Sequence, residues 1–224
     1  MGVDLSQSTL LALGALVAAS LGWACWPGRA ARHARGLRRL LALVLALLAL
    51  LAGALGWTLR GYLPWRPGSL VAEVAVRAEA GGGAPQRFLV EVALPGRTPE
   101  RFVLEGDQWQ IDVRLLRWRP FLAVLGAPRL FLPERIGARH ADLDAERRRP
   151  RSVHALHGEE RGLEWRWMRR LLGWLPVLEA DFGSSAYLPL IDGTRFRVEV
   201  GDQGGIVALP ADARTAERLA TQDW

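Results

Sequence analysis

Two apolar stretches near the amino terminus dominate the hydropathy pattern of this chain. The second, Leu40 to Leu59, contains no charged residue, and a helix of that length spans about 30 Å, the thickness of a bilayer's hydrocarbon layer. The first, Leu10 to Trp26, is shorter, and Ser8 and Thr9 precede it as helix-capping residues. We therefore predict a transmembrane helical hairpin within residues 1–62.

The loop between these spans, residues 27–39, contains five arginines and no acidic residue: Arg29, Arg32, Arg35, Arg38 and Arg39. Short loops rich in cations stay on the cytoplasmic side, so these arginines are the predicted topology determinants and both chain ends are expected outside. Aromatic side chains are typical of membrane interfaces. The interface residues predicted here are Trp23, Trp26, Trp57, Tyr62 and Trp65.

A change of period marks the start of a second region. Residues 63–69 contain two prolines and a glycine and are predicted to be a linker. From Leu70 onward, polar and apolar residues alternate in four segments, 70–79, 88–94, 102–104 and 108–115, which predicts an antiparallel meander with one buried face. The apolar positions expected on that face are Val74, Val76, Val90, Val92, Phe102, Leu104, Trp109, Ile111 and Val113.

Helical spacing returns between Leu163 and Leu178, where an apolar stripe includes Trp167 and Leu171. This helix is expected to cover the sheet; the alternative is a helix that lies on the membrane surface. Near the carboxyl end, Asp192 and Gly193 separate two alternating segments, which predicts a β-hairpin before a short helix at 212–220. The predicted fold class is therefore α+β, with a β-rich domain over residues 70–224.

Three segments have less regular patterns. Residues 116–132 are apolar but interrupted by prolines, and are expected to cover the core or add a strand. Residues 138–157 are polar and are predicted to form a solvated loop. Gly183, Ser184 and Ser185 do not match a nucleophile elbow, which requires a second glycine two residues after the serine. We predict a turn there instead.

The distribution of charged residues along the chain argues against two classes of function. The formal net charge is +6, yet from Arg60 onward 24 arginines face 22 acidic residues. The basic excess therefore lies in the membrane loop, which argues against nucleic-acid binding. Neither predicted span contains an ionisable residue, whereas ion and proton pathways usually require such groups within the membrane. Cys25 is the only cysteine, so the domain must be stable without an intrachain disulfide.

The polar midsection supplies the candidate ligand-binding residues. Metal-type ligands there are His140, Asp142, Asp144, His154 and His157, but their spacing matches no established ligand pattern. Four arginines are candidate contacts for an anionic ligand or partner, with pairing to the upstream acids as the favoured alternative: Arg147, Arg148, Arg149 and Arg151. We assign no catalytic residue, no cofactor and no metal site from the sequence.

Three segments carry a resemblance to a known family: FVLEGDQWQIDVRLLRWRPFLAVLG at 102–126, RPRSVHAL at 149–156 and WLPVLEADFGSSAYLPLIDG at 174–193. They resemble short two-span proteobacterial inner-membrane proteins that often carry the label "cation/multidrug efflux pump" or "multidrug transporter". The resemblance implies a bacterial inner membrane and a periplasmic domain. The family has no established activity that would assign roles to these residues.

The preferred prediction is a non-enzymatic interaction or scaffold protein of the bacterial cell envelope, which contacts the lipid bilayer and another envelope protein. A first alternative is an accessory or oligomeric subunit of a transporter, which ionisable residues within the spans would have favoured. A second alternative is an envelope hydrolase or transferase, which a pocket of acids and histidines would favour.

Overall fold

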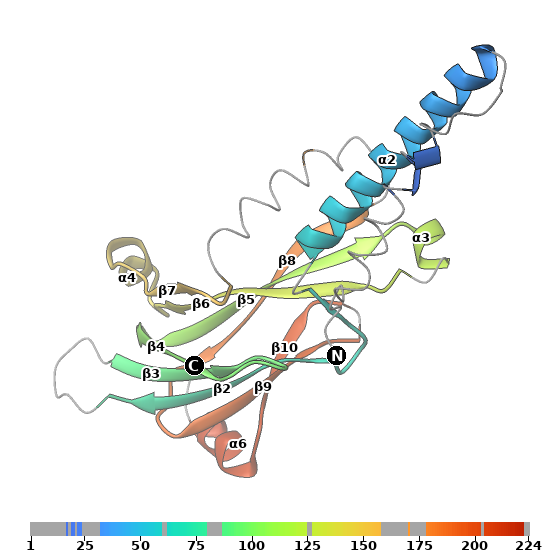
Figure 1. Cartoon of the computed structure of the whole chain (residues 1–224). Coiled ribbons are helices and arrows are strands. Elements are labelled where there is room, and N and C mark those ends of the chain that lie inside the picture. The colour runs from blue at the N-terminus through green and yellow to red at the C-terminus, as the bar shows by residue number, and fades with distance from the viewer. Residues whose placement is uncertain are drawn as a thin grey trace.

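The computed structural model describes residues 17, 19–20, 22–23, 32–59, 62–79, 87–124, 127–157, 170, 178–202 and 204–221. Within these residues the fold is α+β, as predicted, with two antiparallel sheets (Figure 1). In sheet 1 the order is β1 (Leu63–Pro64), β6 (Leu130–Arg139), β5 (Gln108–Trp118) and β8 (Leu178–Pro189), and β7 (Val153–Ala155) also pairs with β6. In sheet 2 the order is β10 (Ile206–Pro210), β9 (Thr194–Val200), β2 (Leu70–Ala78), β3 (Arg87–Ala93) and β4 (Glu100–Glu105).

The two sheets pack face to face around one shared core. Successive strand residues point to opposite faces of a sheet, and the inward set of both sheets is buried: Val74, Val76, Val90, Leu104, Trp109, Ile111, Val113, Ile136, Leu188, Phe196 and Val198. Trp109 of β5 lies at the centre with no exposed surface, and its ring centroid is 5.4 Å from that of Phe196 on β9. The domain is therefore a β-sandwich.

The predicted four-stranded meander is wrong at its fourth strand. Strands β2, β3 and β4 pair in sequence, but β5 belongs to the other sheet and pairs with β6 and β8. The chain passes from sheet 2 to sheet 1 at Gly106, where it runs close to the Arg139 carbonyl. A side chain does not fit there, because a Cβ would lie 2.8 Å from that oxygen. Sheet 1 thus covers the apolar face of sheet 2.

The predicted helix from Leu163, with Trp167 and Leu171, lies largely outside the described residues.

The predicted carboxyl-terminal hairpin is also wrong, because β8 and β9 lie in different sheets. The connection at Asp192 and Gly193 bonds to β2 instead: Asp192 Oδ1 accepts from the Ala78 amide at 2.8 Å, and the Gly193 amide donates to the Val76 carbonyl at 2.9 Å. Gly193 has a φ of 69°, a conformation that favours glycine. The hairpin that does form joins β9 to β10.

The irregular segments contain more structure than their patterns indicate. Residues 116–132 hold the end of β5, the short helix α3 (Pro120–Val124) and the start of β6. The predicted loop at 138–157 contains α4 (Leu143–Arg148) and β7, and the predicted turn at 183–185 lies within β8. The final helix, α6 (Ala213–Ala220), is confirmed, with Asp212 as its cap: Asp212 Oδ1 accepts from the Thr215 amide at 2.7 Å.

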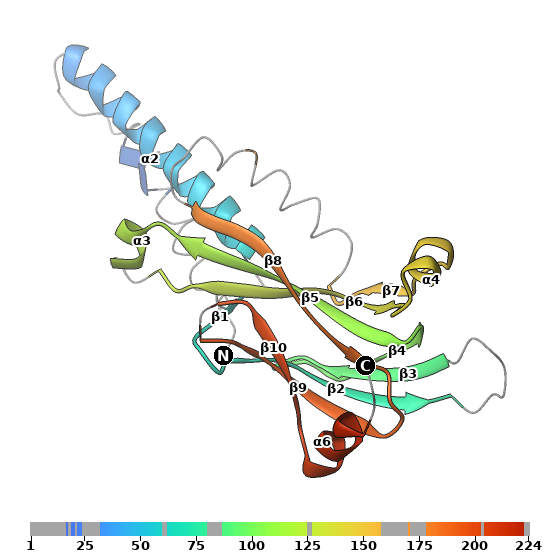
Figure 2. The same ribbon diagram turned by 180° about the vertical axis from the view of Figure 1, so that it is seen from behind.

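The long helix α2 (Arg32–Leu59) projects away from the sandwich (Figures 1 and 2). It begins at Arg32, so most of the basic segment predicted as a loop is helical. Its segment Gly36–Ala54 is long and apolar enough to cross a membrane. Of the first predicted span, residues 17, 19–20 and 22–23 are described, and they are helical; the remainder of residues 10–26 lies outside the described part.

In α2 the small apolar side chains are buried and the large ones are exposed, the reverse of the pattern in a core helix of a water-soluble protein. The small side chains of Ala42, Ala46 and Ala49 are at most 8% exposed. The large apolar side chains are open, with Leu43 at 64% and Leu47 at 66%. Small residues are typical of helix contacts inside membranes, where large apolar side chains face lipid. The helix thus exposes its most apolar surface.

The junction between α2 and the sandwich is packed. Tyr62 is 2% exposed and lies with Leu116, Trp118 and Leu130 in a second apolar cluster, against which Leu59 of α2 also packs. The segment predicted as a linker is part of the domain, because β1 pairs with β6 and the Trp65 amide donates to the Arg129 carbonyl at 2.9 Å.

Two of the predicted interface residues lie inside this packed junction. Tyr62 and Trp65 are buried at 2% and 4% exposure. The Tyr62 amide bonds to the Leu59 carbonyl at the end of α2, and β1 begins at the next residue, Leu63. Trp57 and Trp23, at 50% and 46% exposed, do present their rings. Trp26 lies outside the described residues.

Candidate functional site

A polar cluster on the outer face of sheet 1 is the candidate site. Along β5, the residues that alternate with the buried Trp109, Ile111 and Val113 point away from sheet 2. Strand register places Asp112 directly between Arg135 of β6 and Ser185 of β8. Three strands that are distant in sequence therefore bring a carboxylate, a guanidinium and a hydroxyl into one row.

Asp112 is the centre of this cluster, and its side chain is 14% exposed. Oδ1 accepts hydrogen bonds from Ser185 Oγ and from Gln110 Nε2, both at 2.5 Å, and Oδ2 accepts from Arg135 Nε. Burial by itself raises the pKa of Asp112, but these hydrogen bonds and the charge of Arg135 outweigh it and hold the pKa below its ordinary value. With its pKa lowered and both oxygens engaged in hydrogen bonds, Asp112 is a weak base, whereas general acid or base catalysis favours a pKa near the operating pH.

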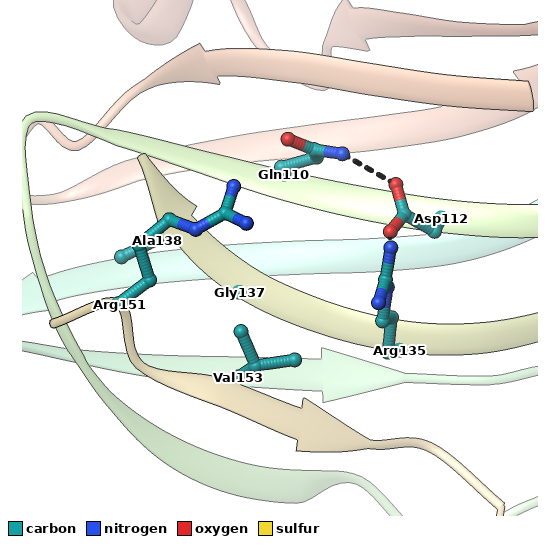
Figure 3. A pocket seen from close by; sticks show the side chains of 7 residues that line it. All are labelled: Gln110, Asp112, Arg135, Gly137, Ala138, Arg151 and Val153. Atoms are coloured by element: carbon teal, nitrogen blue, oxygen red, sulfur yellow. Dashed lines mark hydrogen bonds and ion pairs between the residues drawn. The ribbon is translucent and has the colours of Figure 1, made fainter. Parts of the chain in front are cut away.

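A small hollow adjoins Asp112 (Figure 3). Its volume is about 30 Å³, space for about two water molecules. Gly137, Ala138 and Val153 line it together with Gln110, Asp112, Arg135 and Arg151. Among the described residues, Arg135 pairs with Asp112, and Arg151 Nη1 lies 3.0 Å from Glu146 Oε1. Both arginine side chains are at least half exposed, so each is accessible to a small anionic group, which guanidinium N–H groups bind well.

The predicted anionic-ligand residues separate into different roles. Arg151 lines the hollow, whereas Arg148 lies 3.2 Å from Asp144, its partner four positions earlier on α4. Arg147 and Arg149 are exposed, and within the described residues neither is in an ion pair. Pairing with upstream acids therefore accounts for two of the four arginines.

The predicted metal ligands lie apart. His140 is buried and its backbone amide bonds to Glu146; Asp142 caps α4; Asp144 pairs with Arg148. His154 Nε2 lies 3.1 Å from the Val103 carbonyl and His157 Nδ1 lies 2.7 Å from the Pro133 carbonyl. Among the residues that the structure describes, no group of three His, Cys, Asp or Glu side chains is placed to hold a metal ion.

The topology determinants are described in part. Arg32, Arg35, Arg38 and Arg39 lie in the first turns of α2, and Arg29 lies outside the described residues. The guanidinium of Arg38 is 5.5 Å from the centre of the Trp23 ring, a cation–π distance. The amino end of α2 is therefore basic and contacts the described part of the first span.

The cluster around Asp112 was not among the predicted site residues. Its sequence signal is the alternation of Gln110, Asp112 and Arg114 along one strand, which indicates an outward polar face and nothing more specific. Arg135 and Ser185 lie 23 and 73 residues further along the chain, so only the strand register brings them to Asp112. No family model, no curated protein and no solved structure matches this chain.

Proposed function

We propose that this chain is a membrane-anchored interaction or scaffold protein of the bacterial cell envelope, which holds a β-sandwich at the periplasmic surface of the inner membrane. The observation that carries the proposal is the exposure pattern of α2. Its large leucines are open and its alanines are buried, so in water the helix would expose a long apolar surface of a kind that soluble proteins avoid. A bilayer removes that cost.

Two spans fit this anchor. The buried alanines of α2 require a neighbour, and the described residues of the first span contribute the buried Ser20 and the Trp23 ring that contacts Arg38. A helical hairpin is the simplest arrangement in which both segments cross the membrane. Arginines at the amino end of α2 favour a cytoplasmic position for that end, which supports the proposal of a periplasmic sandwich.

The packed junction supports a domain held close to the membrane. Tyr62 and Leu59 lie in one apolar cluster with residues of β5 and β6, and β1 joins sheet 1 within a few residues of the end of α2. A domain attached in this way has little freedom to swing. It is suited to presenting a fixed surface to another envelope protein.

Reporter fusions test the proposed topology. A reporter that is active only in the periplasm, fused after Trp224, is expected to be active, and the same reporter inserted at Gly28 is expected to be inactive. The opposite pattern would show that the orientation is reversed. An active reporter at both positions would show that α2, which lies between them, does not cross the membrane.

A further inference from the structure

Strand β8 forms one margin of sheet 1 and pairs with β5 on its inner side. The Leu190 amide donates to the Asp107 carbonyl at 2.9 Å, which continues the β5–β8 register and fixes its alternation. Even-numbered residues of β8 therefore bond to β5, and the backbone N–H and C=O groups of Gly183, Ser185 and Tyr187 point outward. No strand within the described residues pairs with this edge, which Figure 2 shows at the margin of sheet 1.

The middle of the β8 edge, residues 183–188, lacks the features that usually prevent strand pairing; the strand has them only at its ends, as Glu179 and Asp181 at one and Pro189 at the other. Native edge strands are protected by charged side chains, bulges or covering segments. Strand β4 illustrates this protection: the Glu105 amide donates to Ser152 Oγ at 3.1 Å, and His154 contacts the Val103 carbonyl. By contrast, residues 183–188 of β8 contain no charged side chain.

Strand β10 holds β8 from the inner face and leaves the outer edge open. The Ile206 amide donates to Ser184 Oγ at 3.0 Å, so the Ser184 side chain points to the inner face of sheet 1. The neighbouring Ser185 side chain points to the outer face, where it bonds to Asp112. Gly183, Ser185 and Tyr187 are all exposed. The edge therefore combines open backbone groups with exposed residues that carry no charge themselves, although Ser185 bonds to Asp112 and Tyr187 contacts Arg139 on the same sheet face.

The sequence of this edge is complementary to itself. If two copies of β8 pair antiparallel about Ser185, Ser185 faces its counterpart and Gly183 of each copy faces Tyr187 of the other. Within one chain the Tyr187 ring lies under the Arg139 guanidinium, 4.7 Å from the ring centre. In the pair it stands opposite Gly183 of the other copy, a cross-strand arrangement of aromatic residue and glycine that stabilises edge strands. No like charges meet at the axis.

We propose that the β8 edge binds the β8 edge of a second copy of this chain, so that sheet 1 continues across a symmetric dimer. The pairing uses three outward residues on each strand, in the order Gly183, Ser185, Tyr187 against Tyr187, Ser185, Gly183. This inference goes beyond the proposed membrane function and does not depend on it. A dimer that forms in detergent would support the pairing whichever way the chain is oriented in a membrane.

Cysteine cross-linking of the purified full chain in detergent tests the register, in a Cys25→Ser background. Paired Ser185 positions lie about 5.5 Å apart between Cα atoms, within the range of a disulfide, so Ser185→Cys is expected to cross-link with itself. Two copies of Gly183→Cys would lie about 14 Å apart and stay single. A mixture of Gly183→Cys and Tyr187→Cys chains is expected to cross-link. Val103→Cys, on the covered edge of β4, is the control.

Mass measurement under native conditions supplies a second test. Ser185→Lys places two like charges at the axis and is expected to weaken dimerisation by about tenfold, while Gln108→Lys adds the same charge to the same sheet face away from the edge and is expected to leave it unchanged. Three results would each overturn the proposal: a monomer at micromolar concentration, Ser185→Cys cross-linking no better than Val103→Cys, or equal dimerisation of both lysine variants.

Discussion

Removal of the Trp109 side chain tests the shared core of the sandwich. Trp109 has no exposed surface, and its Nε1 has no hydrogen-bond partner among the described residues, so Trp109→Ala removes packing without breaking a hydrogen bond. Truncation of a buried tryptophan costs about 3 to 5 kcal/mol in the free energy of unfolding. This is a large fraction of the total stability of a domain, which is typically about 5 to 15 kcal/mol. Arg77→Ala, at an exposed position of β2, is the matched control and is expected to change stability by less than about 0.5 kcal/mol.

The same side chain reports on contact between the sheets. Trp109 belongs to sheet 1 and Phe196 to sheet 2, with ring centroids 5.4 Å apart. A double-mutant cycle with Trp109→Ala and Phe196→Ala, measured by urea unfolding of the full chain in detergent, is expected to give a coupling energy of about 0.5 to 1.5 kcal/mol. Additive effects, or equal midpoints for Trp109→Ala and Arg77→Ala, would refute the face-to-face packing.

Two further predictions concern Asp112 and Gly106. The folded-state pKa of Asp112 is lowered, so its stabilising contribution is present at neutral pH and is lost as the pH falls through that pKa. The stability difference between wild type and Asp112→Asn is therefore expected to be larger at neutral pH than at about pH 3, and a difference that grows in acid would contradict this. Gly106→Ala is expected to cost about 1 to 3 kcal/mol, because a Cβ there meets the Arg139 carbonyl at 2.8 Å. Gly36→Ala, at a position of α2 with nothing within 4 Å, is the control, and equal unfolding midpoints would show that the chain at Gly106 tolerates a side chain.

Much of the strand content could be predicted from the sequence, because alternation with a period of two depends only on which face of a strand is buried. Val74, Val90 and Ile111 were all correctly expected to point inward. The assignment of strands to sheets could not be predicted, because Ile111 has the same pattern whether its strand extends the meander or faces it. The crossing depends on the close approach of Gly106 to the Arg139 carbonyl, a contact between distant residues.

The burial of Tyr62 and Trp65 at the domain boundary could not be predicted for a related reason. Tyr62 and Trp65 follow an apolar span, and aromatic residues in that position are typical of membrane interfaces. Their burial depends on the pairing of β1 with β6, which two residues of strand do not reveal. The turn predicted at Gly183 to Ser185 is wrong, because pairing along β5 holds this segment in a strand. The Asp112 cluster depends on the same pairing.

The central claim is that α2 lies within a bilayer, and cysteine labelling in intact membranes tests it most directly. The protein itself leaves Leu47 66% exposed and Val207 of β10 46% exposed, so in water a cysteine at either position should react with a water-soluble maleimide. In a Cys25→Ser background, Leu47→Cys is expected to remain unlabelled until the membrane is dissolved and the chain unfolded, whereas Val207→Cys reacts at once when its side of the membrane is accessible. Labelling of Leu47→Cys as fast as Val207→Cys would contradict a membrane-embedded helix.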